Sequence, residues 1–432
     1  MTLTVTVCGG GNGAHCSAGY IASKGFRVNI LTRKPEKWSD TLTITTATSS
    51  WASKGSFVGK LAVVSNDPAD VIPDSDVVIV AAPAHVHGSI LKGCAEYLKE
   101  GVFVGTIFAQ GAFDWIATEA LGSSMSKVKA IFGLQNIPWI CKITEYGKEA
   151  RILGPKDVLK VVSYPVEAVD EVASLMTRFY DIPSTTIPNF LSVTLTPSNQ
   201  IIHPARYYSI FRDALERKAA ANGGDDWGYT REELEASKSL ELYKDFDPLS
   251  AEILACLDNE LQTIKLGLTL HFPQLDLTLV PPIAQRICET YGDDVGDSSS
   301  LLQIMRTNKG YVGCGTPMTK ASNGKFQPNT GCRLFWEDVP FGLCILKGLA
   351  EQLGNIPTPT INKMIFWHQE FMGKEYLRED GTLNPLLIME TGHPSRYGLH
   401  TVADIVAKSL PSAMMGWTGV ADGSGKGIPS KL

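Results

Sequence analysis

A glycine-rich turn near the N-terminus constrains the fold more than any other part of the sequence. It has the pattern G-x-G-x-x-A, follows an apolar run at residues 4–8, and precedes a stretch of small residues. Such a turn between a strand and a helix is typical of dinucleotide-binding folds, because glycines let the backbone approach a pyrophosphate at the helix N-terminus. A turn that binds no nucleotide is the alternative. The predicted cofactor contacts are Gly9, Gly11, Asn12, Gly13 and Ala14.

Strand and helix patterns alternate through the first half of the chain and then give way to helical patterns. Apolar runs predict parallel strands at residues 26–31, 62–65, 76–82, 101–105 and 130–133. An irregular polar passage occupies residues 41–56. In the second half, apolar spacing predicts helices at residues 234–243, 251–268, 284–291, 341–353, 359–372 and 402–410. We therefore predict an α/β Rossmann domain with a doubly wound parallel sheet over residues 1–193, and an all-α domain over residues 194–432.

The composition of the chain excludes several classes of protein. Its length of 432 residues suits two domains, and 44% hydrophobic with 19% charged residues is normal for a folded protein. A net charge of −6 without basic runs argues against nucleic-acid binding, and no apolar run reaches the ~18 residues that span a membrane. The chain starts directly with a strand pattern, so we expect no signal peptide. The nine scattered cysteines lack C-x-x-C pairs, which indicates a reducing compartment, with neither a zinc site nor a disulfide framework.

The residues after the second predicted strand bear on the choice of nicotinamide cofactor. In this position a carboxylate binds a ribose 2′-hydroxyl, whereas a cation accommodates a 2′-phosphate. The chain has Thr32, Arg33 and Lys34 here, with no acid before Glu36. Because arginine binds phosphate strongly, the sequence slightly favours NADPH over NADH. Alternatively, Arg33 stacks on the adenine or points to solvent.

A short polar segment follows the buried run at residues 76–82, at the carboxyl end of the predicted sheet. It contains Pro83, His85 and His87. Doubly wound sheets bind ligands at this edge, so we expect Pro83 to lie in a loop that lines the nicotinamide side of the site. Two histidines without further ligands at suitable spacing are weak evidence for a metal, and we predict no metal site.

The stretch at residues 194–204 joins the two predicted domains and contains a candidate acid/base group. Thr196 followed by Pro197 is typical of a helix start, with a capping hydroxyl and a proline at the first helical position. Asn199 and His203 then share one face of that helix, and Pro204 should kink it. A histidine that faces the groove between two domains is well placed for catalysis. Alternatively, His203 is an ordinary polar residue at a helix–helix contact.

Two charged residues far downstream are candidates to act with this histidine. Asp338 can hold the second ring nitrogen of an imidazole, or it can cap the helix that follows Pro340. Arg333 stands among aromatic residues and, if buried there, needs an anion partner. That partner is either a substrate carboxylate or Glu337.

Amide side chains stand in two turns that follow predicted strands. Gln110 lies in the first turn, and Gln135 and Asn136 lie in the second. Such amides can hold the carboxylate or carbonyl of a substrate, or they can simply satisfy the backbone of their own turn.

Several windows of the chain resemble the opine dehydrogenase family, in particular its octopine dehydrogenase branch from invertebrates. They keep the same order across nearly the whole chain, at residues 7–15, 137–139 with 141, 203–204, 307–309 with 311, 333–340 and 396–398. The resemblance implies a Rossmann domain joined to an all-helical domain, with the active site between them. It also implies reductive condensation of an amino acid with a 2-oxo acid, usually pyruvate. The family includes octopine, alanopine, strombine and tauropine dehydrogenases.

The resemblance also implies roles for single residues. His203 matches the catalytic acid/base of the family, and Asp338 matches its carboxylate partner. Arg333 matches the arginine that binds the carboxylate of the oxo acid. Gln110 and Asn136 fall where side chains help to hold pyruvate, although the family pattern has threonine at the second position.

Departures from the octopine-forming branch bear on the amine donor. Gln135 stands where that branch has an acid able to face the guanidinium of arginine, and Asn199 stands where it has an aromatic residue. These changes favour a small neutral amino acid such as glycine or alanine, giving strombine or alanopine, with taurine and β-alanine as further options. The basic pair Arg33 and Lys34 also departs from the NADH use of invertebrate members.

Two other functions fit the same domain plan. A 2-oxo-acid or ketopantoate-type reductase would reduce an oxo acid without any amine. A non-catalytic sensor would bind NADP without turnover, but it has no need for His203, Asp338 and Arg333 together.

The last three residues are Ser430, Lys431 and Leu432, behind a glycine-rich segment at residues 422–427. This tripeptide at a free C-terminus is an address for the peroxisomal import receptor. We therefore expect a peroxisomal location, with the cytoplasm as the alternative.

Overall fold

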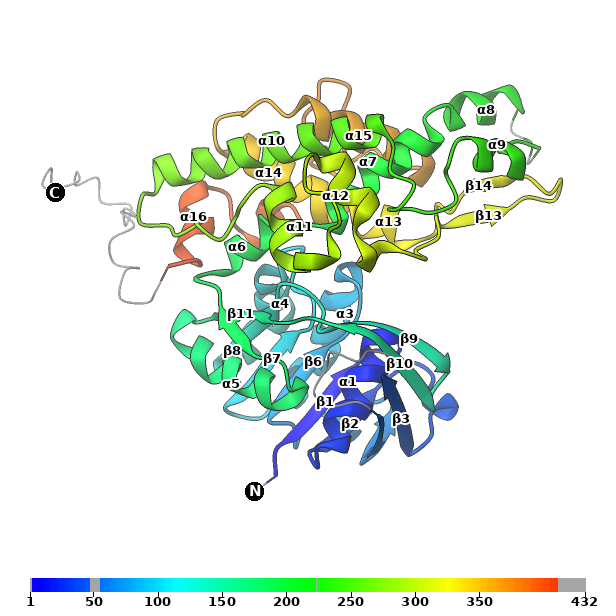
Figure 1. Cartoon of the computed structure of the whole chain (residues 1–432). Coiled ribbons are helices and arrows are strands. Elements are labelled where there is room, and N and C mark those ends of the chain that lie inside the picture. The colour runs from blue at the N-terminus through cyan, green and yellow to red at the C-terminus, as the bar shows by residue number, and fades with distance from the viewer. Residues whose placement is uncertain (1, 47–54, 223, 225, 411–432) are drawn as a thin grey trace, which may run out of the picture.

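The computed structural model shows a sheet-containing N-terminal domain and a helical C-terminal domain that lie against each other (Figure 1). It describes residues 2–46, 55–222, 224 and 226–410. The targeting tripeptide predicted at residues 430–432 lies outside these ranges. Among the described helices, none combines the length and the apolar character that crossing a membrane requires.

The N-terminal domain is built on an eight-stranded sheet with the strand order β12-β11-β8-β7-β6-β1-β2-β5. All neighbouring strands are parallel except β8 and β11, which are antiparallel. All six strands predicted from apolar runs between residues 4 and 133 are confirmed. The strands of this sheet are β1 (Thr4–Cys8), β2 (Arg27–Leu31), β5 (Val63–Ser65), β6 (Val77–Val80), β7 (Val102–Thr106), β8 (Val128–Leu134), β11 (Leu159–Tyr164) and β12 (Ser184–Thr186).

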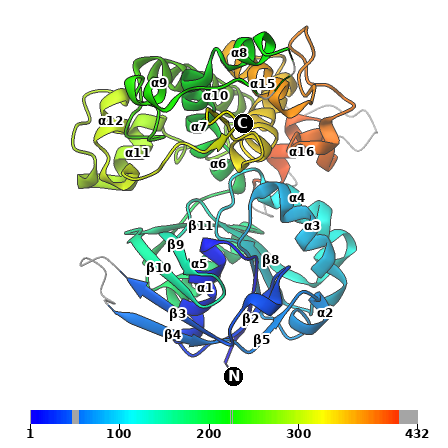
Figure 2. The same ribbon diagram turned by 90° about the vertical axis from the view of Figure 1, so that its right-hand side faces the viewer.

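Helices cover both faces of this sheet, which is the reason that its central strands β1, β6 and β7 are buried along their whole length. One core cluster joins α1 and α5 to β1, and a second joins α2, α3 and α4 to the opposite face. Figure 2 shows α2, α3 and α4 together on one side of the sheet. The helices are α1 (Asn12–Ser23), α2 (Pro68–Val71), α3 (Ala84–Cys94), α4 (Phe113–Leu121) and α5 (Val169–Tyr180).

A second sheet was not expected from the sequence. Its order is β4-β3-β10-β9, formed by β3 (Thr41–Thr46), β4 (Ser56–Lys60), β9 (Trp139–Glu145) and β10 (Glu149–Pro155). The prediction of irregular structure at residues 41–56 is therefore wrong at both ends. Leu42 and Ile44 are fully buried, and their alternation with threonines is the pattern of a half-buried strand. The threonines made the segment look uniformly polar, so the sequence did not predict a strand here.

The C-terminal domain is mostly helical, and the long helix α10 crosses it from side to side (Figure 1). Its core is one continuous apolar cluster. The hairpin β13 (Met318–Lys320) and β14 (Phe326–Pro328) corrects the prediction of an all-α domain. The helices are α6 (Phe190–Thr194), α7 (Asn199–Phe211), α8 (Ala214–Ala220), α9 (Arg231–Ala236), α10 (Pro248–His271), α11 (Ile283–Tyr291), α12 (Leu301–Thr307), α13 (Arg333–Trp336), α14 (Cys344–Gln352), α15 (Pro359–Met372) and α16 (Val402–Ala407).

Five of the six helices predicted in the second half are present, and the sixth is much shorter than predicted. The helix predicted at residues 234–243 ends at Ala236, and Lys238 has a φ of +51°. A positive φ at a residue other than glycine is incompatible with a continuing right-handed helix. The chain therefore leaves the helix and carries Tyr243 toward the domain junction.

The helix that carries His203 starts later than predicted. Helix α7 begins at Asn199, and Pro204 lies inside it as expected. The Thr196 hydroxyl donates to the carbonyl of Ser192 at 2.9 Å, so it terminates α6 and does not cap α7. The domain boundary predicted between residues 193 and 194 falls at the C-terminal end of α6.

Candidate active site

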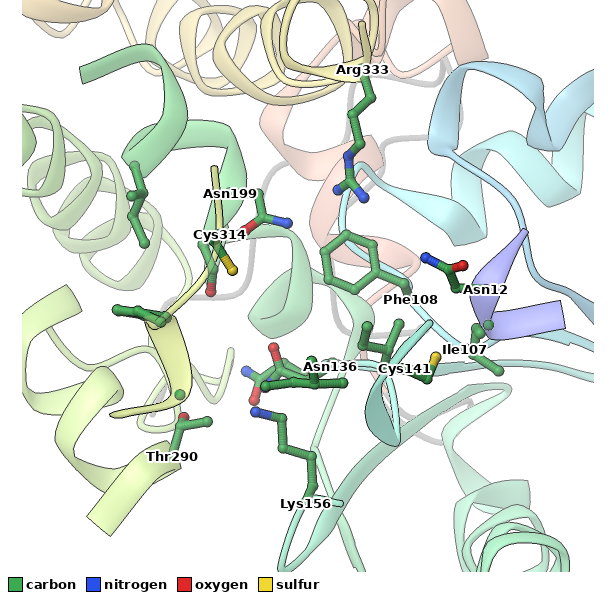
Figure 3. A pocket seen from close by; sticks show the side chains of 18 of the residues that line it. Asn12, Ile107, Phe108, Asn136, Cys141, Lys156, Asn199, Thr290, Cys314 and Arg333 are labelled. Atoms are coloured by element: carbon green, nitrogen blue, oxygen red, sulfur yellow. The ribbon is translucent and has the colours of Figure 1, made fainter. Parts of the chain in front are cut away.

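A cavity of about 430 Å³ lies between the two domains, and both domains contribute side chains to its wall. Its size is in the usual range for small-molecule sites. Figure 3 shows Asn12, Phe108 and Lys156 of the sheet domain facing Asn199 and Arg333 of the helical domain across this space. The cavity therefore occupies the edge of the sheet at which doubly wound folds bind their ligands.

The glycine turn forms one end of the cavity, and its geometry fits a dinucleotide. A Cβ on Gly9 would lie 2.4 Å from the carbonyl oxygen of Ala81, so the turn requires glycine at this point. Gly11 has open space around its Cα, and no side chain caps the first turn of α1. The free N–H groups of α1 and the space beside Gly11 are what a pyrophosphate needs. Gly13 packs closely on Ile107, and Ala14 is buried.

Asn12 stands beside this turn and lines the cavity. Its side-chain oxygen accepts a hydrogen bond from the backbone N–H of Ile143 at 3.0 Å. This bond ties the start of α1 to β9 of the second sheet. Asn12 thus fixes the shape of the turn, with its amide at the cavity wall.

The three residues predicted to select the cofactor lie just after β2. Thr32 is buried, whereas Arg33 and Lys34 are exposed. Within the described part of the chain, the side chains of Arg33 and Lys34 form no hydrogen bond or ion pair. Both cations are thus available to a phosphate group.

The segment that contains Pro83 is the start of a helix and not the predicted loop. Pro83 is the N-cap of α3 and lines the cavity. His87 is buried in the first turns of α3, where a ring nitrogen lies 2.6 Å from the carbonyl oxygen of Ala82. Burial lowers the pKa of His87 to about 4, so this histidine is neutral and structural. In the described ranges, no group of three or more potential ligands is placed to hold a metal ion.

His203 and Asp338 form a buried pair, although 135 positions of sequence separate them. Nδ1 of His203 lies 2.6 Å from Oδ2 of Asp338, and both side chains are almost completely buried. Because a carboxylate can only accept, Nδ1 carries the proton in this pair and Nε2 is left as an acceptor. Asp338 does not cap the following segment with its side chain. Of the two roles predicted for Asp338, the structure shows the contact to the imidazole.

The hydroxyl of Tyr243 contacts the second ring nitrogen of His203, and the sequence did not predict this contact. Its hydroxyl lies 2.6 Å from Nε2 and donates to that nitrogen, while its side chain lines the cavity. The ring stacks on Tyr311 with 4.6 Å between centroids. Burial raises the pKa of Tyr243 well above its usual value, so the hydroxyl keeps its proton. Tyr243 therefore stands between the imidazole and the cavity.

Arg333 reaches into the cavity from the first turn of α13 (Figure 3). Its Nε lies 3.0 Å from Oε2 of Glu337, which is buried and is the alternative partner that the sequence offered. The other oxygen of Glu337 accepts the backbone N–H of Ala84 at 2.9 Å, which links the two domains. Nη1 and Nη2 of Arg333 form no hydrogen bond with a described residue, so the outer edge of the guanidinium remains available to a carboxylate.

The four predicted amide residues have different surroundings. Asn136 and Asn199 line the cavity, as Figure 3 shows. Gln135 also lines it, but its amide donates to the Thr196 hydroxyl at 2.8 Å. Gln110, for which a substrate contact was predicted, is buried behind the wall and does not itself line the cavity. Its amide bonds the carbonyl of Gln135 at 3.1 Å and the N–H of Ser198 at 3.1 Å. Gln110 therefore holds together the backbone segments that carry Asn136 and Asn199.

Two further cations line the cavity, Lys156 after β10 and Arg286 in α11. Neither belongs to a motif, so only the folded chain reveals them. With Arg333 they give the cavity an excess of positive charge, because Glu337 is the one carboxylate among its described lining residues.

Known proteins resemble the chain over almost its whole length. A family model described as the alpha-helical domain of NAD/NADP octopine/nopaline dehydrogenase matches residues 186–372. Octopine dehydrogenase from Mizuhopecten yessoensis is 30% identical over 417 residues, which cover 94% of this chain and 99% of that protein. Tauropine dehydrogenase from Arabella iricolor is 29% identical over 416 residues, which cover 94% of this chain and 100% of that protein.

A solved structure of octopine dehydrogenase with NADH and L-arginine superposes with a TM-score of 0.79 at 28% identity. The superposition covers 94% of this chain and 98% of the chain in that structure. The family resemblance inferred from separate sequence windows is thereby confirmed over the full domain arrangement. Together with the glycine turn and the cavity between the domains, these matches show that the chain belongs to the opine dehydrogenases, NAD(P)-dependent oxidoreductases that act on CH–NH donors.

Proposed function

We propose that this enzyme condenses pyruvate with a small neutral amino acid, glycine or alanine, and reduces the product to strombine or alanopine. The observation that carries the proposal is the absence of a free carboxylate among the described residues of the cavity wall. Glu337 is engaged by Arg333 and by the Ala84 amide, and Gln135 is neutral. The guanidinium of an arginine donor would meet cations and amides, where it needs an acid.

The condensation requires a base and an acid within reach of the same atoms. The donor amine must lose a proton to attack the carbonyl carbon of pyruvate, and the resulting hydroxyl must gain a proton to leave as water. His203 suits both events, since an imidazole exchanges protons near neutral pH. Asp338 fixes the ring and stabilises its protonated form. A bound nicotinamide cofactor supplies the hydride that reduces the imine.

Arg333 positions the oxo acid in this proposal. Its free guanidinium edge binds the pyruvate carboxylate, while Glu337 holds Nε from behind. Orientation of this kind lowers the activation free energy because the reacting carbon is already held in position for the attack. Asn136 and Asn199 supply amides to the same space.

Tyr243 controls access to His203, and a substitution tests this. We expect Tyr243→Phe to lower kcat by about 10- to 100-fold, because proton exchange between the cavity and Nε2 passes the Tyr243 hydroxyl. Steady-state kinetics with saturating substrates measure the effect. Tyr97→Phe is the matched control, since Tyr97 lies in the N-terminal domain and outside the cavity. A Tyr243→Phe enzyme with the wild-type kcat would show that the hydroxyl merely packs against the ring.

NADPH is the proposed cofactor, slightly ahead of NADH. Arg33 and Lys34 follow β2, at the position where Rossmann folds select the ribose substituent. Their side chains are exposed and form no ion pair with another described residue, so a 2′-phosphate can bind to both. The same segment offers no carboxylate to a 2′-hydroxyl before Glu36.

A panel of amines with pyruvate, under NADPH and under NADH, tests the proposal. The amines are glycine, alanine, taurine, β-alanine and arginine. We expect the highest kcat/KM with glycine or alanine, a much lower value with arginine, and a lower KM for NADPH than for NADH. A preference for arginine would refute the proposed donor. Cofactor oxidation that is equally fast with pyruvate alone would instead indicate a reductase that needs no amine.

A further inference from the structure

Lys156 and Arg286 lie on the part of the cavity wall that is formed with Tyr291 and Tyr311. The ammonium of Lys156 lies 4.2 Å from the centroid of the Tyr291 ring, and this ring packs edge-on against Tyr311 with 5.1 Å between centroids. Arg286 and Tyr291 both come from α11. Aromatic faces stabilise a cation but do not neutralise it.

Arg286 is a buried cation that makes few contacts, although the carboxylate of Asp258 partly opposes the effect of burial on its pKa. It is 5% exposed, and its one hydrogen bond runs from Nη2 to the carbonyl oxygen of Pro197 at 2.6 Å. Its Nε has no partner, and among the described residues no carboxylate forms an ion pair with it. Burial lowers the pKa of Arg286 to about 10. A guanidinium has five N–H donors, so a buried one with so few contacts is expected to serve a bound anion.

Lys156 is a second cation of the wall, and the carboxylates of Asp157 and Asp294 act on it only from a distance, without an ion pair. Burial lowers its pKa to about 8, and it forms no ion pair within the described ranges. Figure 3 shows its ammonium pointing into the cavity toward Asn136, from the side opposite Arg333. The arrangement thus presents positive charge at two separate places, with amide side chains between them.

The charges of the described lining residues are three cations and one carboxylate. Glu337 offsets Arg333, so Lys156 and Arg286 remain for a ligand. We propose that Lys156 and Arg286 form an anion subsite that binds the acid group of the amine donor, either a carboxylate or a sulfonate. This assignment rests on the proposed function, because it assumes that both substrates share this cavity. Arg333 then holds the acid group of the oxo acid, and the reacting nitrogen and carbon meet between the two subsites.

The subsite defines a class of donor. Amines that carry an acid group a short distance from the nitrogen are substrates, whether the acid is a carboxylate, as in alanine, or a sulfonate, as in taurine. Amines of similar size without an acid, such as ethylamine, leave both cations unpaired and are rejected. The length between nitrogen and acid decides which of the acidic amines reacts fastest.

The variants Lys156→Met and Arg286→Met test the subsite in the full-length enzyme. Each keeps much of the side-chain length and removes the charge. With the donor that gives the highest wild-type kcat/KM, we expect the donor KM to rise at least about tenfold, while the pyruvate KM changes by less than about twofold. Lys142→Met is the matched control, because Lys142 is an exposed lysine of β9 outside the cavity. Arg286→Lys should recover part of the affinity.

A second measurement needs no variant and covers the case in which Arg286→Met fails to fold. Wild-type enzyme is assayed with propionate and, separately, with propylamine as inhibitors. Propionate should compete with the amine donor, and propylamine should inhibit far less. An unchanged donor KM in Lys156→Met, or a rise in the pyruvate KM instead, would overturn the subsite. If arginine proves to be the best wild-type donor, the proposed donor is wrong, and the variant assay with arginine still decides the subsite separately.

Discussion

Replacement of His203 by alanine is expected to lower kcat by about 10²- to 10⁴-fold, the usual range for loss of a general acid/base. The reason is the position of the imidazole, which Asp338 holds at 2.6 Å through Nδ1 while Nε2 faces Tyr243 and the cavity. Among the described residues, no other imidazole is hydrogen-bonded to a buried carboxylate. Steady-state kinetics measure the loss.

The affinity for the reduced cofactor should not change in this variant. The glycine turn and the start of α1 lie in the other domain, and the variant leaves both intact. Fluorescence titration with NADPH provides the comparison, and His271→Ala at the exposed end of α10 provides the control. A wild-type kcat in His203→Ala would remove the imidazole from the mechanism. A loss of cofactor binding would point to a disturbed fold.

Replacement of Arg333 by alanine is expected to raise the pyruvate KM by about 10- to 100-fold, which corresponds to a charge-assisted carboxylate contact of ~1.5–3 kcal/mol. The donor KM should change far less, because the guanidinium faces the oxo acid. Arg333→Lys keeps the charge but loses the planar fork, so it should recover only part of the affinity.

The same variant carries a second, structural consequence. Burial raises the pKa of Glu337, and Arg333 is the cation that opposes this effect. Without Arg333 no guanidinium balances the charge of the buried Glu337 carboxylate, so the variant should unfold at a lower temperature. The double variant Arg333→Ala with Glu337→Gln should recover part of that stability without recovering the pyruvate KM. Equal increases in both substrate KM values would reassign Arg333 to a general structural role.

The sequence was sufficient to predict a site where that site consists of residues close together in the chain. The glycine turn is such a case, because strand, glycines and helix follow one another within residues 4–23. The sequence offered Asp338 either as the partner of an imidazole or as a helix cap, and the family resemblance favoured the first role. No local pattern decides between the two roles, because 135 positions separate His203 from Asp338. Their contact depends on the packing of α7 against the segment after α13.

Other features depended on tertiary contacts that the sequence does not encode locally. Thr196 has the chemistry of a helix cap, yet its hydroxyl bonds back to Ser192. Gln110 has the chemistry of a substrate contact, yet its amide bonds backbone groups from two segments of the chain. Polar residues can satisfy several partners equally well, so their roles are decided by which partner the fold brings near.

Lys156 and Arg286, two cations of the cavity wall, show most clearly that a role can depend on tertiary contacts. Lys156 and Arg286 belong to no motif and lie 130 positions apart, as their numbers show. The folded chain brings the segment after β10 and helix α11 to one cavity, where Lys156 is half-buried and Arg286 is buried. Tyr243 follows the same rule, because its role depends on the early end of α9.

The identity of the reaction product decides whether the enzyme condenses an amine with pyruvate. Enzyme is incubated with pyruvate, alanine and NADPH, and the product is analysed by mass spectrometry. Formation of a secondary amine that joins both carbon skeletons, absent when alanine is omitted and strongly reduced in His203→Ala, is the predicted result. Conversion of pyruvate to lactate, with alanine recovered unchanged, would contradict it.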